Sequence, residues 1–291
     1  MSAAKELQGY LGRLLGWANT SAIEHALRSI DLAMEHRAQL VLCGHGDLVP
    51  LAYGLHRRAF GADAPFIVCD PRRGDTPATV RSPANLANAA AAFDAAAGGS
   101  LCVRRRRPPH DFSSLVTRLR SSRDVQYICL DEDSLRWLVR PGPIEVPSIA
   151  TRASELPRIV DEYVLDAIVE LAAARDLSLN EPDRNWLLEE AATSSLAEIE
   201  KATLRMVALR CSSNLSQAAA RLGMAPVSLS RWVARRKLST LDQRQLLLPV
   251  DDNYICRFVD ERTARVTARN LPPPDVGARA SRWSPTAKSA F

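Results

Sequence analysis

The sequence predicts an α/β protein, in which a reduced parallel sheet is followed by an all-helical part that ends in a helix-turn-helix. In the first 150 residues, short apolar runs alternate with segments of helical periodicity, which is typical of a parallel sheet with covering helices. After about residue 155 the strand-like runs stop and amphipathic helices follow. Residues 214–237 then read as two short helices joined by a tight turn.

Four apolar runs predict buried strands. In chain order they read QLVLCGHG, PFIVCD, GGSLCV and DVQYICLDED. The segments between them predict helices at about residues 49–60, 85–97 and 112–120, and the polar stretch PRRGDTPATVRSP predicts a loop. Strands that are apolar throughout are expected in a parallel sheet whose two faces are both covered.

The remaining helices are predicted on both sides of this region. Residues 4–38 indicate one helix to about Trp17 and a second from Thr20, capped by Thr20 or Ser21. Further helices are expected at residues 156–174, 181–192 and 196–211. Ser194 or Ser195, followed by Glu198, resembles a capping box at the start of the last one.

The stretch NLSQAAARLGMAPVSLSRWVARRK carries the strongest functional signal. Four small or apolar residues form one helical face: Leu215, Ala218, Ala219 and Leu222. Gly223 is suited to a left-handed helix end, and Pro226 to the first turn of the next helix. Leu229 and Val233 are expected to pack back on the first helix, with Trp232 beside them. In a helix-turn-helix the second helix enters the DNA major groove.

The outward residues of this segment are the candidate DNA contacts. Arg231 is the candidate for base readout, since arginine pairs well with guanine, with Val227 and Ser228 beside it. Six polar residues are candidates for phosphate contacts: Asn214, Ser216, Gln217, Arg235, Arg236 and Lys237. The alternative is a helical hairpin inside a larger all-α domain. Eight Lys or Arg against two Glu in residues 198–237 favour the DNA-binding interpretation.

Composition limits the kinds of partner, location and site that this protein is expected to have. The chain has 291 residues and a formal net charge of +5, which fits an anionic partner. It has no apolar run of about 18 residues and no signal-peptide pattern at its start, so we expect a cytoplasmic protein without a membrane span. The six cysteines show no paired spacing and the histidines are scattered. We therefore expect no disulfide, metal site, cofactor or catalytic residue.

The order of these pieces resembles the sigma-54-dependent transcription activators, the bacterial enhancer-binding proteins, which join an AAA+ ATPase domain to a Fis-type helix-turn-helix. The stretch LVLCGHGD…LAYGLHRR…APFIVCD is similar to the family's phosphate-loop strand, helix and second strand. AFDAAAGGSLCV, IEVPSIATRASELPRIV and SSLAEIEKATLR are similar to the segments around the Walker B strand and the helical lid. The resemblance covers residues from about 20 to 240 and implies a reduced AAA+-like core.

The sequence departs from the family pattern at the motifs that bind and hydrolyse ATP and at the loop that engages the sigma factor. The loop GHGDLV lacks the Lys and the hydroxyl that bind phosphate and magnesium. Arg104 and Arg105 stand where Walker B acids are expected, and Ala197 matches the sensor II arginine. Residues 71–97 contain nothing like the GAFTGA loop that engages the sigma factor. We therefore expect neither ATP hydrolysis nor sigma-54 remodelling.

The predicted organisation has five parts: N-terminal helices at 1–38, a degenerate AAA+-like core at 39–154, a helical lid at 155–195, a Fis-type helix-turn-helix at 196–240, and an extension at 241–291 with a hairpin and a disordered tail. In Fis-type domains the first long helix usually pairs with its twin. Five residues are candidates for such a seam or for packing on the lid: Leu196, Ile199, Thr203, Met206 and Val207.

The arginine run after the third strand has two interpretations. A charge run is most often a solvated loop. Since carboxyl ends of parallel strands hold ligands in α/β folds, the run is also a weak candidate anion site, formed by Arg104, Arg105, Arg106 and Arg107. The sequence thus predicts a homodimeric, DNA-binding transcription regulator with an inactive core. The alternative is a non-enzymatic adaptor that docks through its α/β core on another regulator or an intact AAA+ activator.

Overall fold

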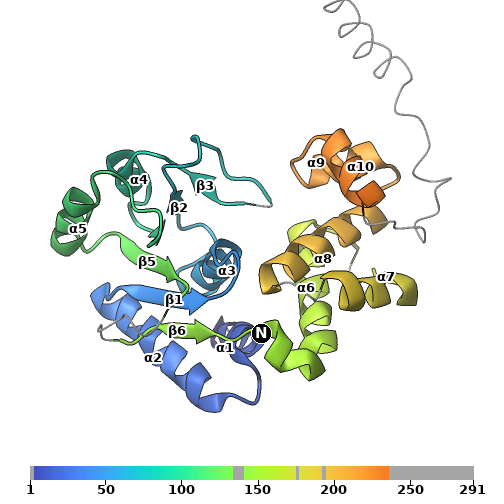
Figure 1. Ribbon diagram of the computed structural model, residues 1–291, viewed down its shortest axis with the longest axis horizontal. Helices are drawn as coiled ribbons and strands as arrows, with labels where there is room; N and C mark the ends of the chain where they lie inside the picture. Colours follow the sequence, from blue (N-terminus) through green and yellow to red (C-terminus); the bar gives the residue numbers. More distant parts are fainter. Residues whose placement is uncertain (1–2, 81, 134–140, 175–176, 192–194, 236–291) are drawn as a thin grey trace, which may run out of the picture. The chain divides into compact units, whose positions relative to one another are not determined.

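Six strands form one parallel sheet in the order β3–β2–β4–β5–β1–β6 (Figure 1). The computed structural model describes residues 3–80, 82–133, 141–174, 177–191 and 195–235. The strands are β1 (Leu40–Gly44), β2 (Phe66–Cys69), β3 (Ala84–Asn85), β4 (Ser100–Arg104), β5 (Gln126–Asp131) and β6 (Ile144–Val146). The predicted fold class, α/β with a reduced parallel sheet followed by helices, is confirmed.

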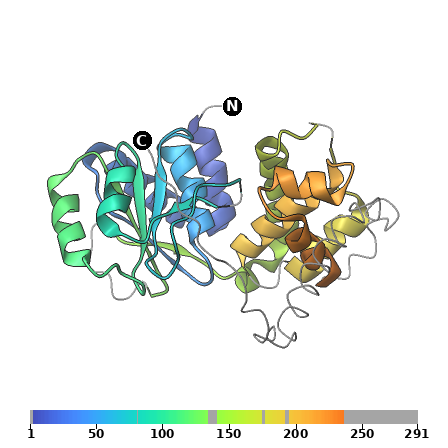
Figure 2. The ribbon, with the colours of Figure 1, turned by 90° about the horizontal axis from the view of Figure 1, so that it is seen from above.

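Helices cover both faces of the sheet because the strands are apolar on both. Five of them belong to this part of the chain: α1 (Ala3–Leu15), α2 (Thr20–His36), α3 (Val49–Ala59), α4 (Ala89–Ala95) and α5 (Phe112–Ser121). On one face, Leu42 and Ile128 lie in a buried cluster with side chains of α1, α2 and α3. On the other, Leu101 and Val103 pack with α4 and α5. Figure 2 shows α4 and α5 on one side of the strands and α3 on the other.

Two short strands, β3 and β6, were not predicted from the sequence. Strand β3 pairs with β2, and β6 pairs with β1 with Leu42 beside Ile144. The expected helix at 85–97 was wrong at its start, because Asn85 belongs to β3. The Asn85 side chain accepts from the N–H of Asp70 at 3.1 Å and donates to the Gly74 carbonyl at 3.2 Å. Helix α4 begins only at Ala89.

Helix ends are fixed by short polar side chains. Asn88 caps α4 by accepting from Ala91 N–H, and Asn19, rather than Thr20 or Ser21, caps α2 by accepting from Ala22 N–H. Ser195 accepts from the N–H of Glu198 at 3.3 Å and starts α8, as its place before an amphipathic run predicts.

After β6 the described residues form helices joined by turns and loops, with no strand. A 3₁₀ segment at Ile149–Glu155 leads into α6 (Leu156–Glu170), followed by α7 (Glu181–Trp186), a π-helical turn (Leu187–Ala191), α8 (Leu196–Arg210), α9 (Leu215–Arg221) and α10 (Pro226–Arg235). Helix α6 ends four residues earlier than the predicted 174. The extension at 241–291, and Arg236 and Lys237, lie outside the described residues.

Contacts of buried arginine and aspartate side chains hold the helical part together and join it to α1. Asp183 on α7 is fully buried and accepts two hydrogen bonds of 2.6 Å from Arg210 on α8. Arg152 is buried and donates to the carbonyls of Leu14 and Arg13 at the end of α1. None of the described helices is both long enough and apolar enough to cross a membrane.

Candidate nucleic-acid interface

Helices α9 and α10 form a tightly packed pair. Asn214 starts α9, its side chain accepting from the N–H of Gln217 at 2.8 Å. Ala218, Ala219 and Leu222 are fully buried, so the two helices approach closely. Gly223 has a φ of +60°, the left-handed conformation expected from its position, and Pro226 is the first residue of α10.

The two faces of α10 differ sharply in burial. Leu229 is fully buried and Trp232 is 6% exposed. The Trp232 ring packs edge-on against Trp186 with centroids 5.6 Å apart, and the Arg205 guanidinium lies 5.2 Å from its centroid. This confirms the interpretation of Trp232 as a core residue. It also fixes the rotation of α10 and therefore decides which residues point outward.

The three residues assigned to base readout all lie on the outward face. Val227 is 55% exposed, and Ser228 and Arg231, one turn apart, are exposed too. Arg235 is exposed one turn further on. The face therefore offers a hydroxyl, a methyl surface and two guanidinium groups on one side of a rigidly held helix.

The start of α9 supplies a second group of exposed polar residues, formed by Asn214, Ser216 and Gln217. Two of them already make local hydrogen bonds. Gln217 Oε1 accepts from the N–H and the hydroxyl of Ser213 at 2.8 and 2.9 Å. The Asn214 side-chain oxygen caps the helix, so the part of this side chain that could donate a hydrogen bond to a phosphate is its NH₂ group.

The apolar face of α8 is used within the chain. The five residues considered for a seam with a second copy are all at most 3% exposed: Leu196, Ile199, Thr203, Met206 and Val207. The four apolar ones lie in the core, where α8 packs against α6, and the Thr203 side chain is fully buried. Of the two interpretations, packing within the chain, on α6, is the one observed.

The carboxyl ends of the sheet strands carry a second cluster of charges. Arg104 ends β4 and donates to Asp47, which follows β1, at 2.8 Å. Arg105 donates to Asp131 at the end of β5 at 2.7 Å. Two further pairs complete what we call the arginine–carboxylate array: Arg106 with Glu132 at 2.8 Å and Arg107 with Asp70 at 3.2 Å.

In this array the four arginines pair with carboxylates of the chain itself, which neither the solvated-loop nor the anion-site interpretation described. The run is not a plainly solvated loop, since the Asp70 side chain is fully buried and that of Asp131 is 4% exposed. Nor is it an open anion site, because each guanidinium faces a carboxylate with which an incoming anion would compete. The hydrogen bond to Asp131 raises the pKa of Arg105 further above its usual range.

Asp47 is held at the place where the resemblance puts a phosphate. Besides its contact with Arg104, its other oxygen lies 3.7 Å from Nζ of Lys201 on α8. The charge expected to repel a phosphate is thus engaged by two cations of the chain itself. A phosphate group would have to displace it from both.

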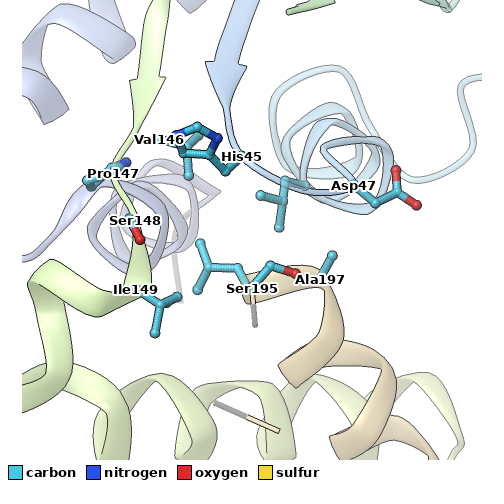
Figure 3. Close-up of a pocket in the computed structure, with 10 residues that line it drawn as sticks. His45, Asp47, Val146, Pro147, Ser148, Ile149, Ser195 and Ala197 are labelled. Atoms are coloured by element: carbon cyan, nitrogen blue, oxygen red, sulfur yellow. The ribbon is translucent and has the colours of Figure 1, made fainter. Parts of the chain in front are cut away.

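A small pocket lies beside Asp47, between the loop after β1 and the start of α8 (Figure 3). His45 and Asp47 line it on one side, Ser195 and Ala197 on the other. Its volume is about 30 Å³, room for roughly one or two water molecules. Ala197 lines the pocket opposite the loop and presents a methyl group to it.

The cysteines and acidic residues suggest no other site in the described part. Cys43, Cys69, Cys102 and Cys129 are buried on strands, and Cys211 is partly buried; all five are free thiols. Burial raises the pKa of the Cys69 and Cys129 thiols to about 11. In the same ranges no group of three or more His, Cys, Asp or Glu side chains is arranged to hold a metal ion.

Comparison with known proteins gives distant structural likenesses. No protein-family model and no curated protein matches the chain. NtrX from Brucella abortus in complex with ATP is 15% identical, with a TM-score of 0.40, over 76% of this chain and 68% of that one. The same protein in complex with ADP is 13% identical, with a TM-score of 0.40, over 75% and 68%.

Proposed function

We propose that this protein is a cytoplasmic, homodimeric regulator of transcription that binds double-stranded DNA in a sequence-specific manner. In this proposal, α9 and α10 are a Fis-type helix-turn-helix and α10 enters the major groove. The observation that carries it is the outward face of α10, where Val227, Ser228 and Arg231 are exposed while Leu229 and Trp232 are buried.

The α/β part serves in this proposal as a scaffold without ATPase activity and without sigma-54 remodelling. The arginine–carboxylate array and the small pocket support this. The carboxylates at these strand ends pair with Arg104 and Arg105. A triphosphate would therefore have to compete with these carboxylates for the guanidinium groups, and a magnesium ion with the guanidinium groups for the carboxylates.

The test is selection of duplexes from a random DNA pool with the full-length protein. Affinity for the selected duplex is then measured at two salt concentrations for wild type and Arg231→Ala. Removing a bidentate base contact should cost about 1–3 kcal/mol and relax the preference at one position. Arg120→Ala, an exposed arginine on α5, is the matched control for loss of one positive charge. Failure to enrich any sequence, or an equal loss on all sequences, would sink the proposal.

A second function is a non-enzymatic adaptor; the feature that favours it lies on the helical part of the chain and not on the α/β core, through which the sequence predicts docking. Leu165 and Val169 lie one turn apart on α6 and are 62% and 79% exposed. Adjacent exposed apolar side chains often mark a protein contact. Loss of binding to a regulator partner in Leu165→Ser, with unchanged DNA selection, would assign this face to an adaptor role. Intact partner binding in that variant would remove the support.

A further inference from the structure

One face of α7 contacts two separate points of the helical part, the end of α8 and the middle of α10. Asp183 and Trp186 lie three residues apart on α7, which places them on the same side of this helix. Both oxygens of Asp183 accept from Arg210, the last residue of α8, at 2.6 Å. The ring of Trp186 stands edge-on to that of Trp232 on α10, with the centroids 5.6 Å apart. Asp183 and Trp186 are together called here the α7 brace.

The pair formed by Asp183 and Arg210 fixes the direction of α7 against α8. The Asp183 side chain is fully buried and the Arg210 side chain is 23% exposed. A guanidinium group forms two parallel hydrogen bonds with a carboxylate only in one planar arrangement, so this pair does not allow the helices to slide as an apolar contact does. Asn180 caps the same helix, its side chain accepting from the N–H of Asp183 at 2.9 Å. These contacts determine where α7 places Trp186.

Helix α9 is also held from outside the α9–α10 pair. Arg221, the last residue of α9, donates from Nη1 to the carbonyl of Leu171, directly after α6, at 3.0 Å. Leu187, directly after α7, is buried in the same core cluster as Leu222 and Leu229. The helix pair therefore shares a core with the helices that precede it in the chain.

We infer that Asp183 and Trp186 are positioning residues for sequence recognition, so that the unit that reads DNA includes α7 as well as the helix pair. This inference rests on the proposed function. Trp186 packs against the buried side of α10 through Trp232, and Arg231 lies on the exposed side of the same helix. Base contacts require side chains held within about 0.5 Å of their place. Because phosphate contacts carry no sequence information, a small displacement of α10 should reduce discrimination between sequences more than affinity for DNA in general.

A role in stability alone makes a different prediction. If α7 contributed only buried area, weakening its contacts would lower the free energy of unfolding, and the molecules that stay folded would keep their preference among sequences. A positioning role changes the preference of the folded molecules themselves. The buried carboxylate of Asp183 suits the second role, because buried ion pairs often add little net stability and yet can fix one arrangement of the chain.

The test measures the affinity of full-length variants for the selected duplex and for a scrambled duplex of the same length, by fluorescence anisotropy below the melting temperature of each variant. Trp186→Leu should lower the ratio of the two affinities about tenfold, with the scrambled duplex bound within about twofold of wild type. Trp186→Phe keeps an aromatic ring against Trp232 and should recover most of the ratio. The matched control is Trp17→Leu, which removes a partly buried ring under Arg158 on α6 and should leave the ratio unchanged.

A second variant, Asp183→Glu, tests the same role while keeping the negative charge. The longer side chain displaces the carboxylate from its two hydrogen bonds with Arg210. The ratio of the two affinities should fall about threefold or more. This variant decides the question if Trp186→Leu shows no cooperative thermal transition.

The outcomes separate this inference from the proposed function. If wild type selects a sequence and the folded Trp186→Leu protein keeps the wild-type ratio, the inference is wrong and the proposed function stands. An equal loss on both duplexes also overturns the inference, because α7 would then contribute only to stability. If Trp186→Leu does not fold, an unchanged ratio in Asp183→Glu overturns it. If wild type selects no sequence at all, the proposed function fails and the inference fails with it.

Discussion

Arg13 on α1 donates a 2.7 Å hydrogen bond to Oδ2 of Asp166 on α6, across 153 residues of chain. Arg58 on α3 donates to the same oxygen at 2.9 Å. The Arg13 side chain is only 4% exposed, and its guanidinium lies 4.4 Å from the centroid of the Tyr163 ring. A single carboxylate thus joins the N-terminal helix and a sheet-covering helix to the first long helix of the helical part.

Removing this carboxylate should destabilise the protein. Asp166→Ala leaves the buried Arg13 guanidinium without its closest partner, which costs about 3–5 kcal/mol in fully buried pairs. Because the Asp166 side chain is 40% exposed, we expect about 2 kcal/mol in the free energy of unfolding, measured by urea denaturation. The control on the same helix is Asp161→Ala, whose pair with Arg184 is exposed on both sides and should cost under about 1 kcal/mol. Equal effects of the two variants would contradict the prediction.

Glu200 should make stability depend on pH. It faces Arg13 on α1, Arg58 on α3 and Asp166 on α6, and its Oε2 is enclosed with no hydrogen-bond partner among the described residues. Burial raises the pKa of Glu200 to about 7.

An acid whose pKa is higher in the folded protein contributes most stability while protonated, so stability falls as pH rises from about 4.5 to 7. Glu200→Gln should remove that loss and be more stable than wild type at pH 8, by up to about 3 kcal/mol. At pH 4.5 the two should differ little. Thermal melts across this range test it, with Glu198→Gln as control; parallel profiles for wild type and Glu200→Gln would refute it.

Two substitutions of Asn214 should separate its role as a helix cap from its predicted contact with phosphate. Asn214→Asp keeps an N-cap oxygen for the Gln217 N–H, so thermal stability should change by less than about 0.5 kcal/mol. Its added negative charge should nevertheless lower DNA affinity by about tenfold if phosphates lie near. Asn214→Ala should instead lose about 1 kcal/mol of stability. Undiminished DNA binding by Asn214→Asp would remove this residue from the interface.

The site at the ends of β1 and β4 should not bind or cleave ATP. Calorimetric titration of wild type with Mg-ATP should give no heat of binding, and a phosphate-release assay should give no turnover. Asp47→Ala removes the carboxylate shared by Arg104 and Lys201 and should give weak, measurable binding of inorganic pyrophosphate. Magnesium-dependent phosphate release by wild type would overturn the assignment of an inactive core.

Trp232 should be needed for the position of α10 rather than for contact with DNA. Trp232→Ala leaves a cavity against Trp186 and Leu229, which is expected to cost about 3–5 kcal/mol. Denaturation followed by Trp fluorescence measures the loss. Val227→Ala, on the exposed side of the same helix, should change stability by under about 0.5 kcal/mol. A small loss in Trp232→Ala would mean that the helix is held by other contacts.

Long apolar runs and cap residues made most of the fold predictable. The strands β1, β2, β4 and β5 each carry three or more consecutive apolar residues, and the turn of the α9–α10 pair is marked by Gly223 and Pro226. Strands β3 and β6 have two and three residues. Neither is long enough to show a period, and both exist because a neighbouring strand has an edge to pair with.

The charge contacts were not predictable because they depend on strand order. The arginine run was visible in the sequence, but its partners follow three other strands: Asp47 after β1, Asp70 after β2 and Asp131 at the end of β5. Only the order of the sheet brings these ends together. Arg13 and Asp166 lie on two helices, 153 residues apart in the chain, and the periodicity of each helix does not reveal that the two pack together.

The arginine–carboxylate array has a consequence for how salt would act on the proposed DNA complex. Each guanidinium after β4 is already neutralised by a carboxylate, so these four residues release no counterions from DNA on binding. The slope of log affinity against log salt, about −0.9 for each phosphate neutralised, would then count the cations on the exposed face of α10. The chain's overall charge of +5 would be a poor guide to that slope.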